Sequence, residues 1–168
     1  MIYTGIGARK TPKGIISTML SVSRLLDRKG YTLRSGGADG ADSAFEEGAT
    51  LVKPEIYLPW PGFNGRTSIY TKPKPETFDI AKIYHPRWDK LSSAAQKFMA
   101  RNVHQVLGWD LVTLSDFVVC WTNNGGAVGG TGQALRIARA CNIPIYNLYN
   151  DEDVAILVGE VLNSKNDE

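Results

Sequence analysis

The chain has 168 residues, of which 43% are hydrophobic and 21% are charged. This balance excludes a disordered or fibrous chain and predicts one globular domain, which we place at residues 1–162 with a frayed tail at 163–168. The formal net charge of +2, from 19 basic and 17 acidic residues, excludes the strong basic footprint of a dedicated duplex-DNA binder, so any recognition of an anion must be local.

Cysteine usage and hydropathy indicate where the protein acts. Cys120 and Cys141 lie in apolar stretches without the spacing of metal ligands, which favours buried thiols in a reducing compartment. No apolar run approaches the roughly 20 residues that span a bilayer, and the N-terminus lacks the apolar core of a signal peptide. We expect a cytoplasmic protein without a membrane partner, a bound metal or a cofactor.

The first part of the chain alternates predicted strands and helices. Residues 1–7 form a short buried strand that runs into a glycine turn, and apolar residues then recur at helical spacing between Pro12 and a stop signal at Lys29. A second strand is expected at 31–35, followed by an alanine-rich helix at about 39–49. This order of elements is typical of a parallel sheet.

The middle of the chain contains a long irregular segment. A third strand is predicted at 55–59, after which residues 60–74 are rich in Pro, Gly, Asn, Thr and Lys. Long irregular loops in compact domains usually have a function. Two helices are expected to follow, at about 76–83 and 92–107.

The last part of the chain resumes the alternation. Residues 117–121 are the clearest buried strand, and the richest glycine turn, 122–132, leads from it into a helix that runs to Cys141. A closing strand is expected at 144–148 and an amphipathic helix after it. The whole pattern predicts an α/β protein with a Rossmann-like three-layer fold, a mainly parallel sheet and helices on both faces.

Three glycine-bearing turns, each placed after a predicted strand, carry the functional signal. They contain Gly5 and Gly7, then Gly36 and Gly37, and finally the run Gly125–Gly132. The strands of a parallel sheet end at one edge, where glycine lets the backbone approach a ligand and helix N-termini offer unpaired N–H donors to phosphate. Glycines that only close tight turns are the alternative, but three converging turns favour a phosphate site.

The third turn ends in the sharpest single motif of the chain. There the hydroxyl of Thr131 and the amide of Gln133 add to the backbone donors of Gly129, Gly130 and Gly132. The motif lacks the Gly-Lys-Ser/Thr ending of a P-loop, and the first turn is not a Gly-x-Gly-x-x-Gly fingerprint. An ATP-hydrolysing enzyme and an ordinary dinucleotide dehydrogenase are therefore both disfavoured.

Basic side chains are predicted beside these turns. Arg9 and Lys10 directly follow the first turn, at the edge where an anion would lie. Arg101, next to Asn102 in a predicted helix, presents a fork of donors that matches phosphate oxygens. A solvated charge pair at a helix start and a salt-bridged surface arginine are the competing interpretations.

Acidic and aromatic side chains complete the candidate site. Asp39 and Asp42 lie at the entrance of the second helix, where carboxylates either cap free N–H groups or, as ligands, hold ribose hydroxyls or the exocyclic amine of a base. Trp60 and Phe63, in the irregular segment, are candidates to stack on a base, although core packing is the commoner use of aromatic residues.

Four segments resemble a known superfamily. They are Thr4-Gly-Ile-Gly-Ala-Arg-Lys, Ser35-Gly-Gly-Ala-Asp-Gly-Ala-Asp-Ser-Ala, Met99-Ala-Arg-Asn and Gly129-Gly-Thr-Gly-Gln-Ala-Leu. Their order and spacing are similar to those of the SLOG superfamily, which unites DNA-processing protein A (DprA), the Lonely Guy phosphoribohydrolases and related nucleotide-sensing domains. The chain looks especially similar to compact DprA-like proteins of bacteriophages. The resemblance implies a homodimer and, for a phage-encoded chain, the host cytoplasm.

The two branches of the superfamily imply different chemistry. In DprA the matching turns bind single-stranded DNA, and the resemblance maps this role onto Gly7, Arg9, Ser35, Gly36, Arg101, Asn102 and Gly130–Gly132. Lonely Guy enzymes cleave the N-glycosidic bond of a nucleoside monophosphate with the glutamate of a Gly-Gly-x-Gly-Thr-x-x-Glu motif.

The Lonely Guy motif is incomplete in this chain. Gln133 stands where that motif has its threonine, and Arg136 stands where it has its glutamate. A guanidinium would oppose the oxocarbenium-like transition state that a carboxylate stabilises. An enzyme would need Asp39, Asp42 or Glu46 in place of the missing glutamate. Arg101 would hold the phosphate.

Three functions stay open at this point. The leading hypothesis is a protein that recognises a nucleoside phosphate or a nucleotide-derived small molecule, with or without N-glycosidic activity. The second is a single-stranded DNA-binding protein of DNA processing, which would lose affinity more steeply with salt because it contacts several phosphates. The third is a non-enzymatic nucleotide-sensing interaction module, which would bind its ligand without turnover.

Overall fold

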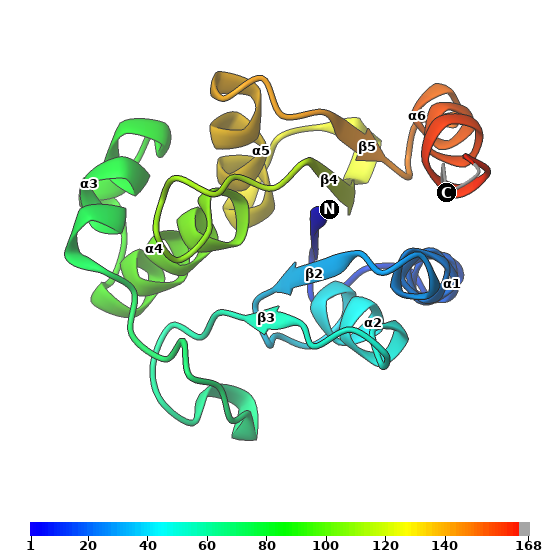
Figure 1. The fold of residues 1–168 in the computed structure, drawn as a ribbon. Coiled ribbons are helices and arrows are strands. Elements are labelled where there is room, and N and C mark those ends of the chain that lie inside the picture. Colours follow the sequence, from blue (N-terminus) through cyan, green and yellow to red (C-terminus); the bar gives the residue numbers. More distant parts are fainter. Residues whose placement is uncertain (165–168) are drawn as a thin grey trace.

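The chain folds around a parallel β-sheet. The computed structural model describes residues 1–164, which Figure 1 draws as a ribbon. Within them, five strands lie in the order β3-β2-β1-β4-β5, each parallel to its neighbours. The strands are β1 (Ile2–Gly7), β2 (Thr32–Ser35), β3 (Glu55–Ile56), β4 (Phe117–Trp121) and β5 (Ile145–Asn147).

Helices cover both faces of the sheet, which gives three layers (Figure 1). One face carries α1 (Lys13–Arg28), α2 (Ala41–Gly48) and α6 (Asp151–Ile156), which continues as a wide π-type helix over Leu157–Leu162. The other face carries α4 (Ser93–Leu107) and α5 (Gly129–Ala140), with α3 (Pro75–Tyr84) packed against both. Short 3₁₀ turns lie at Phe63–Gly65, Trp88–Lys90 and Asn123–Gly125. The predicted fold class is confirmed.

Side chains alternate between the two faces along the central strands. Tyr3 and Phe117 pack in the cluster under α1 and α2, whereas Ile6, Val118 and Cys120 pack in the cluster under α4 and α5. All five side chains are buried. Strands covered on both faces read as continuous apolar runs, and each large apolar side chain buried in this way contributes roughly 1.5–3 kcal/mol.

The third strand is shorter than the sequence predicts. The prediction covers residues 55–59, but β3 ends at Ile56. Beyond it, Tyr57 N still donates to Ser35 O at 2.9 Å, whereas Leu58 N donates to Tyr70 O at 2.8 Å. The irregular segment therefore returns to the sheet edge and takes over the backbone pairing of the predicted strand.

The helix after the richest glycine turn begins earlier than predicted. The turn was expected to extend to Gly132, but α5 begins at Gly129 because Gly132 N donates to Val128 O at 2.9 Å and closes the first helical turn there. A Cβ atom on Gly132 would overlap the backbone of Ala127. Glycine at this position thus lets the turn before the helix pack closely against the first helical turn.

The described end of the chain is tied to the C-terminus of α1. Lys29 Nζ donates to Ser164 O at 2.6 Å, and the rest of the predicted tail, 165–168, lies outside the described residues.

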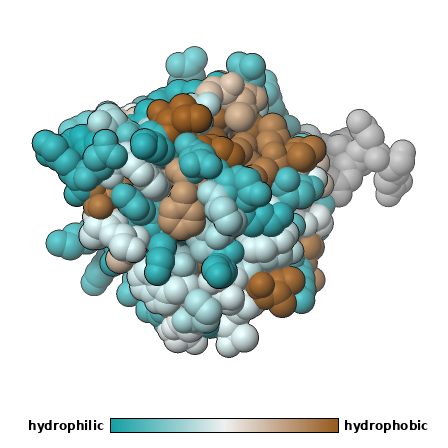
Figure 2. Space-filling view, turned by 90° about the vertical axis from the view of Figure 1, so that its left-hand side faces the viewer, coloured by the Kyte–Doolittle hydropathy of each residue, from teal (hydrophilic) through white to brown (hydrophobic). Residues whose placement is uncertain are grey.

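Among the helices of residues 1–164, none combines the length and the apolar character that a bilayer span requires. The face at the left of Figure 1, near α3 and α4, is largely hydrophilic, with apolar side chains gathered in its upper part (Figure 2).

Candidate functional site

A cavity of about 330 Å³ opens at the carboxyl end of β1. This strand and its neighbour β4 form the switch point of the sheet, because the chain leaves β1 toward α1 on one face and enters β4 from α4 on the other. The cavity is lined by the β1–α1 turn, the β2–α2 turn, α4 and the N-terminus of α5. The predicted site residues that it brings together are Gly7, Arg9, Asp42, Arg101, Asn102, Gly129, Gly130 and Thr131.

Arg101 and Asn102 connect two of the glycine turns. Arg101 Nη1 donates to the carbonyl of Gly36, and Asn102 Nδ2 donates to Gly130 O at 3.2 Å. The two side chains are joined by Arg101 Nε, which donates to Asn102 Oδ1 at 2.9 Å. Arg101 is 6% exposed, so the alternative of a surface arginine is wrong. Arg101 also lines the cavity, so its guanidinium lies beside any ligand bound there.

The N-terminus of α5 supplies backbone donors to the cavity. Gly129, Gly130 and Thr131 form its first turn and line the cavity, and no side chain caps this end of the helix. The first N–H groups of a helix have no intrahelical acceptor and carry a partial positive charge. This end of α5 can therefore bind the oxygens of a phosphate.

Asp42 is the acidic member of the cavity lining. Its Oδ2 accepts from Ala38 N at 3.2 Å and lies 3.8 Å from Arg101 Nη1. Burial raises the pKa of the Asp42 carboxyl to about 6; Arg101 opposes this shift and the charge of Glu46 adds to it. Within residues 1–164, Asp42 Oδ1 and both amide atoms of Gln105 have no hydrogen-bond partner, which is unusual for buried polar atoms.

The other two candidate acids, Glu46 and Asp39, lie outside the cavity lining. Glu46 Oε1 accepts from Ser35 Oγ and from Gly37 N, each at 2.9 Å, and its Oε2 pairs with Arg66 at 2.8 Å. Asp39 is exposed and accepts from Asn64 Nδ2 at 3.0 Å. Glu46 thus holds the second turn closed, and Asp39 ties that turn to the irregular segment.

Two predicted ligand-binding residues point into the protein. Gln133 is fully buried, and its Nε2 donates to Ala81 O of α3 at 3.4 Å. Because α5 begins at Gly129, Gln133 lies a full turn inside the helix rather than at its first N–H groups. Gly5 lies within β1, where a Cβ would overlap the ring of Phe45, so its smallness serves packing.

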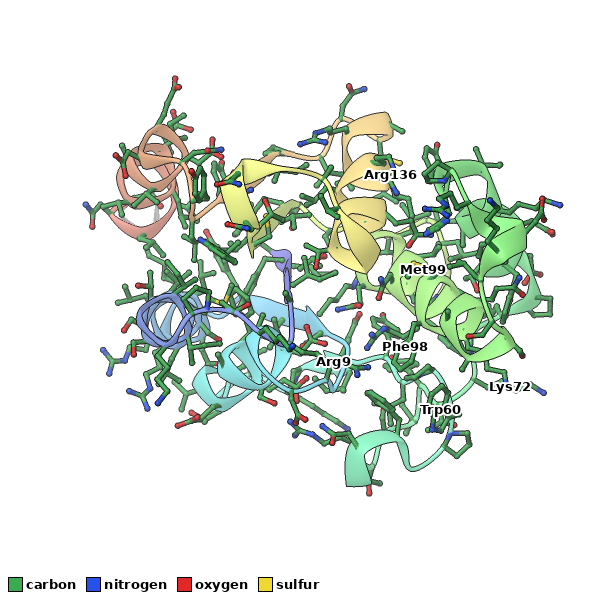
Figure 3. All side chains as sticks on the ribbon, turned by 180° about the vertical axis from the view of Figure 1, so that it is seen from behind. Arg9, Trp60, Lys72, Phe98, Met99 and Arg136 are labelled. Atoms are coloured by element: carbon green, nitrogen blue, oxygen red, sulfur yellow. The ribbon has the colours of Figure 1, made fainter. Side chains whose placement is uncertain are left out.

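An aromatic cluster borders the cavity on the side of the irregular segment. Phe98, on α4, lines the cavity and lies 5.2 Å from the guanidinium of Arg9 and 5.6 Å from that of Arg101. The rings of Trp60 and Phe63 pack edge-on against it, at 5.1 and 5.3 Å between centroids. Figure 3 shows Arg9, Phe98 and Trp60 following one another on this side of the protein.

Sequence reasoning missed Phe98 and Gln105 as site residues. They precede and follow Arg101 by three and four positions on the same helix, and residues at these spacings share a helix face. The helical spacing around Arg101 was the signal that would have found both. Arg136, which stands at the position of the Lonely Guy glutamate, donates to Tyr84 O at 2.7 Å and to Ala127 O at 3.2 Å.

A second cavity continues the first along the sheet edge. It has a volume of about 620 Å³ and shares Ala8, Val128, Gly129 and Thr131 with the first. Lys10, which does not line the first cavity, lines the second together with the β4–α5 turn. Val128, which is 78% exposed, stands between the two. In the described part of the chain, no three or more His, Cys, Asp or Glu side chains are grouped to hold a metal ion.

The fold and the position of the cavity define a doubly wound α/β protein with its candidate site at the switch point of the sheet. No protein-family model and no curated protein matches the sequence. A solved structure of DNA processing protein A from Helicobacter pylori, described for its single-stranded DNA binding mode, is similar over 98% of this chain and 74% of its own, with 18% identity and a TM-score of 0.58. This similarity shows that the chain has a DprA-like fold.

Proposed function

We propose that the protein binds single-stranded DNA along the carboxyl edge of its sheet. The observation that carries the proposal is the cavity in which the N-terminus of α5, Arg9 and the ring of Phe98 meet. Backbone amides and a guanidinium suit phosphate oxygens, and an aromatic ring suits the face of an unpaired base. Each nucleotide of single-stranded DNA carries both a phosphate and an unpaired base.

Two features favour single-stranded DNA over a single nucleotide or a duplex as the ligand. The first and second cavities share four lining residues, so a ligand that fills one can continue into the other. The net charge of +2 is small for a protein that grips the densely charged duplex backbone. The rings at this site are half-buried, and aromatic rings beside a few local cations are typical of single-strand binding.

The comparison with the H. pylori protein supports the same proposal. That protein binds single-stranded DNA, and its fold covers 98% of this chain. Fold alone does not define function, so the proposal depends on the site itself. Six of the residues onto which the resemblance maps DNA binding line the cavity: Gly7, Arg9, Arg101, Asn102, Gly130 and Thr131.

A binding measurement with matched variants tests the proposal. Fluorescence anisotropy of a labelled oligothymidylate should show binding by the full chain that weakens with salt, and a weaker response to a duplex of equal length. Arg9→Ala should lower affinity about tenfold, since a charged hydrogen bond is worth about 1.5 kcal/mol or more. Arg24→Ala, an exposed arginine on α1, is the control and should bind as the unaltered protein does.

Phe98→Ala should also weaken binding, by removing one stacking surface worth about 1–3 kcal/mol. Equal affinity for single strand and duplex, or equal affinity of the Arg9, Phe98 and Arg24 variants, would contradict the proposal. Thermal denaturation of each variant ensures that a loss of binding reflects the site rather than unfolding.

A second candidate, a nucleoside monophosphate site, is favoured by Asp42. A carboxyl with a pKa of about 6 beside an arginine is suited to proton transfer near neutral pH, and perturbed groups of this kind gather at active sites. Of the three candidate acids, Asp42 alone lines the cavity among residues 1–164. Release of free base from a panel of nucleoside monophosphates, abolished by Asp42→Asn with binding retained, would establish this activity. Tight nucleotide binding without turnover would instead indicate a sensing module.

The wider assignments belong to the same proposal. They are membership of the SLOG superfamily, a bacteriophage DprA-like origin, one domain over residues 1–162 and a homodimer that shares the ligand edge. Light scattering after gel filtration, with and without oligonucleotide, tests the oligomeric state directly.

A further inference from the structure

We infer that an apolar pocket beyond Trp60 binds a second base of the strand whose phosphate lies in the first cavity. This inference rests on the proposed function and extends it to a separate pocket of about 220 Å³. Its walls are Pro59, Trp60, Pro73 and Phe78, and Lys72 and Lys97 stand at its rim. It has two-thirds of the volume of the first cavity, which suits a planar base rather than a whole nucleotide.

The pocket adjoins the candidate site through two neighbouring side chains. Trp60 forms a wall of the pocket and packs edge-on against Phe98, which lines the first cavity. Lys97 precedes Phe98 on α4, so consecutive residues of one helix serve the two spaces. In Figure 3, Arg9, Phe98, Trp60 and Lys72 follow one another from the middle of the molecule toward its edge.

The chemistry of the pocket fits a base with its phosphates outside. Pro59 and Pro73 are buried and Trp60 and Phe78 are half-buried, so the interior is apolar. Lys72 and Lys97 are exposed, and no acidic side chain lines the pocket. Apolar and aromatic walls accept the face of any base, whereas an ammonium group is a point charge for phosphate.

The segment that builds the pocket is held in place before any ligand arrives. At one end, Asn64 Nδ2 donates to Gly37 O at 3.1 Å and Arg66 pairs with Glu46 at 2.8 Å. At the other end, Lys74 N donates to His104 Nε2 at 3.1 Å. A site that is already formed costs less ordering entropy on binding.

Length-dependent binding by charge-reversal variants tests the inference. Lys72→Glu/Lys97→Glu should lower affinity at least tenfold for an oligothymidylate of about six nucleotides, and the salt slope should fall by about 1.4, roughly 0.7 for each phosphate contact. The same variant should bind thymidine monophosphate as the unaltered protein does, because a single nucleotide with its phosphate in the first cavity has no second base for the pocket. Lys82→Glu/Lys90→Glu, two exposed lysines elsewhere, is the matched control.

Photo-crosslinking locates the base without any change to the protein. An oligonucleotide with a single 5-iodouracil should crosslink to Trp60 or Phe78 when that base lies one or two positions from the bound phosphate. Crosslinks that map to other segments, or equal affinity of the two double variants for the longer oligonucleotide, would overturn the inference and leave the proposed function intact. No binding of any single strand by the unaltered protein would overturn both.

Discussion

The second and third glycine turns look alike in sequence and differ in what their backbone groups do. In the second turn Gly37 N donates to Glu46, and Gly36 O accepts from Arg101, so its polar groups are used inside the protein. In the third turn, Gly130 O likewise accepts from Asn102, but Gly129 and Gly130 also line the cavity at the start of a helix that no side chain caps, so its first N–H groups are left for a ligand. A glycine-rich turn thus either braces a site or binds a ligand, and the partners of its backbone groups decide which.

The largest loss of stability should come from adding a side chain at Gly36, in the second turn. A Cβ on Gly36 would overlap the guanidinium of Arg101 and the carboxylate of Asp42. Gly36→Ala should therefore lower the free energy of unfolding by about 3 kcal/mol, the upper end for overpacking, because neither charged group can leave a buried site freely. Urea denaturation of the full chain measures it, and a loss below about 0.5 kcal/mol would show that the turn has room to relax.

Removal of the Glu46 carboxylate, which accepts two hydrogen bonds from the second turn, should cause the next largest loss of stability. Glu46→Ala leaves Ser35 Oγ and Gly37 N without their acceptor and should cost about 2 kcal/mol in unfolding free energy. Glu46→Gln keeps an oxygen for both donors and loses only the pair with the partly exposed Arg66, so it should cost about 1 kcal/mol or less. An equal loss of unfolding free energy in the two variants would mean that Glu46 stabilises the protein through its ion pair with Arg66 and not through its hydrogen bonds to the turn.

Asp42 lies between the two turns and should make stability depend on pH. Its folded pKa, about 6, is above its ordinary value of 3.8, so the folded state binds a proton more tightly than the unfolded state. The stabilising contribution of the protonated carboxyl is complete below pH 4 and is lost as the pH rises through 6. The difference in unfolding free energy between the unaltered protein and Asp42→Asn should change by about 2 kcal/mol across this window, and a constant difference would contradict the assignment.

The smallest effect on stability should come from the third turn. A Cβ on Gly130 would lie 3.1 Å from Asn102 Nδ2 and 3.3 Å from Met99 Cε, both side-chain atoms that can shift. Because alanine also favours a helix, Gly130→Ala should change the unfolding free energy by less than about 0.5 kcal/mol. It should nevertheless weaken binding of single-stranded DNA, since it narrows the cavity. Unchanged affinity would remove this part of α5 from the binding site.

Much of the fold follows from local patterns, whereas the division of roles at the site does not. The alternating strands and helices were predicted because buried strands and amphipathic helices have different periods. The end of β3 depended on its pairing with Tyr70, fourteen residues beyond Ile56 in the chain, which no local pattern indicates.

The acidic residues show the same limit more sharply. Asp42 and Glu46 lie one turn apart on α2, yet Asp42 faces Arg101 of α4 and Glu46 faces Arg66 of the irregular segment. Their roles are set by which distant arginine packs against each carboxylate. Sequence reasoning offered Asp39, Asp42 and Glu46 as alternatives for one missing acid, because no local pattern indicates which arginine each carboxylate meets.

Amide chemical shifts would test the central difference between the two turns most directly. In a titration of the ¹⁵N-labelled full chain with a short oligothymidylate, the amides of Gly129, Gly130 and Thr131 and those of Gly7 and Arg9 should shift most. The amide of Gly37, which is bonded to Glu46, should shift little. Large shifts at Gly37 with none at the start of α5, or no shifts anywhere, would contradict the account.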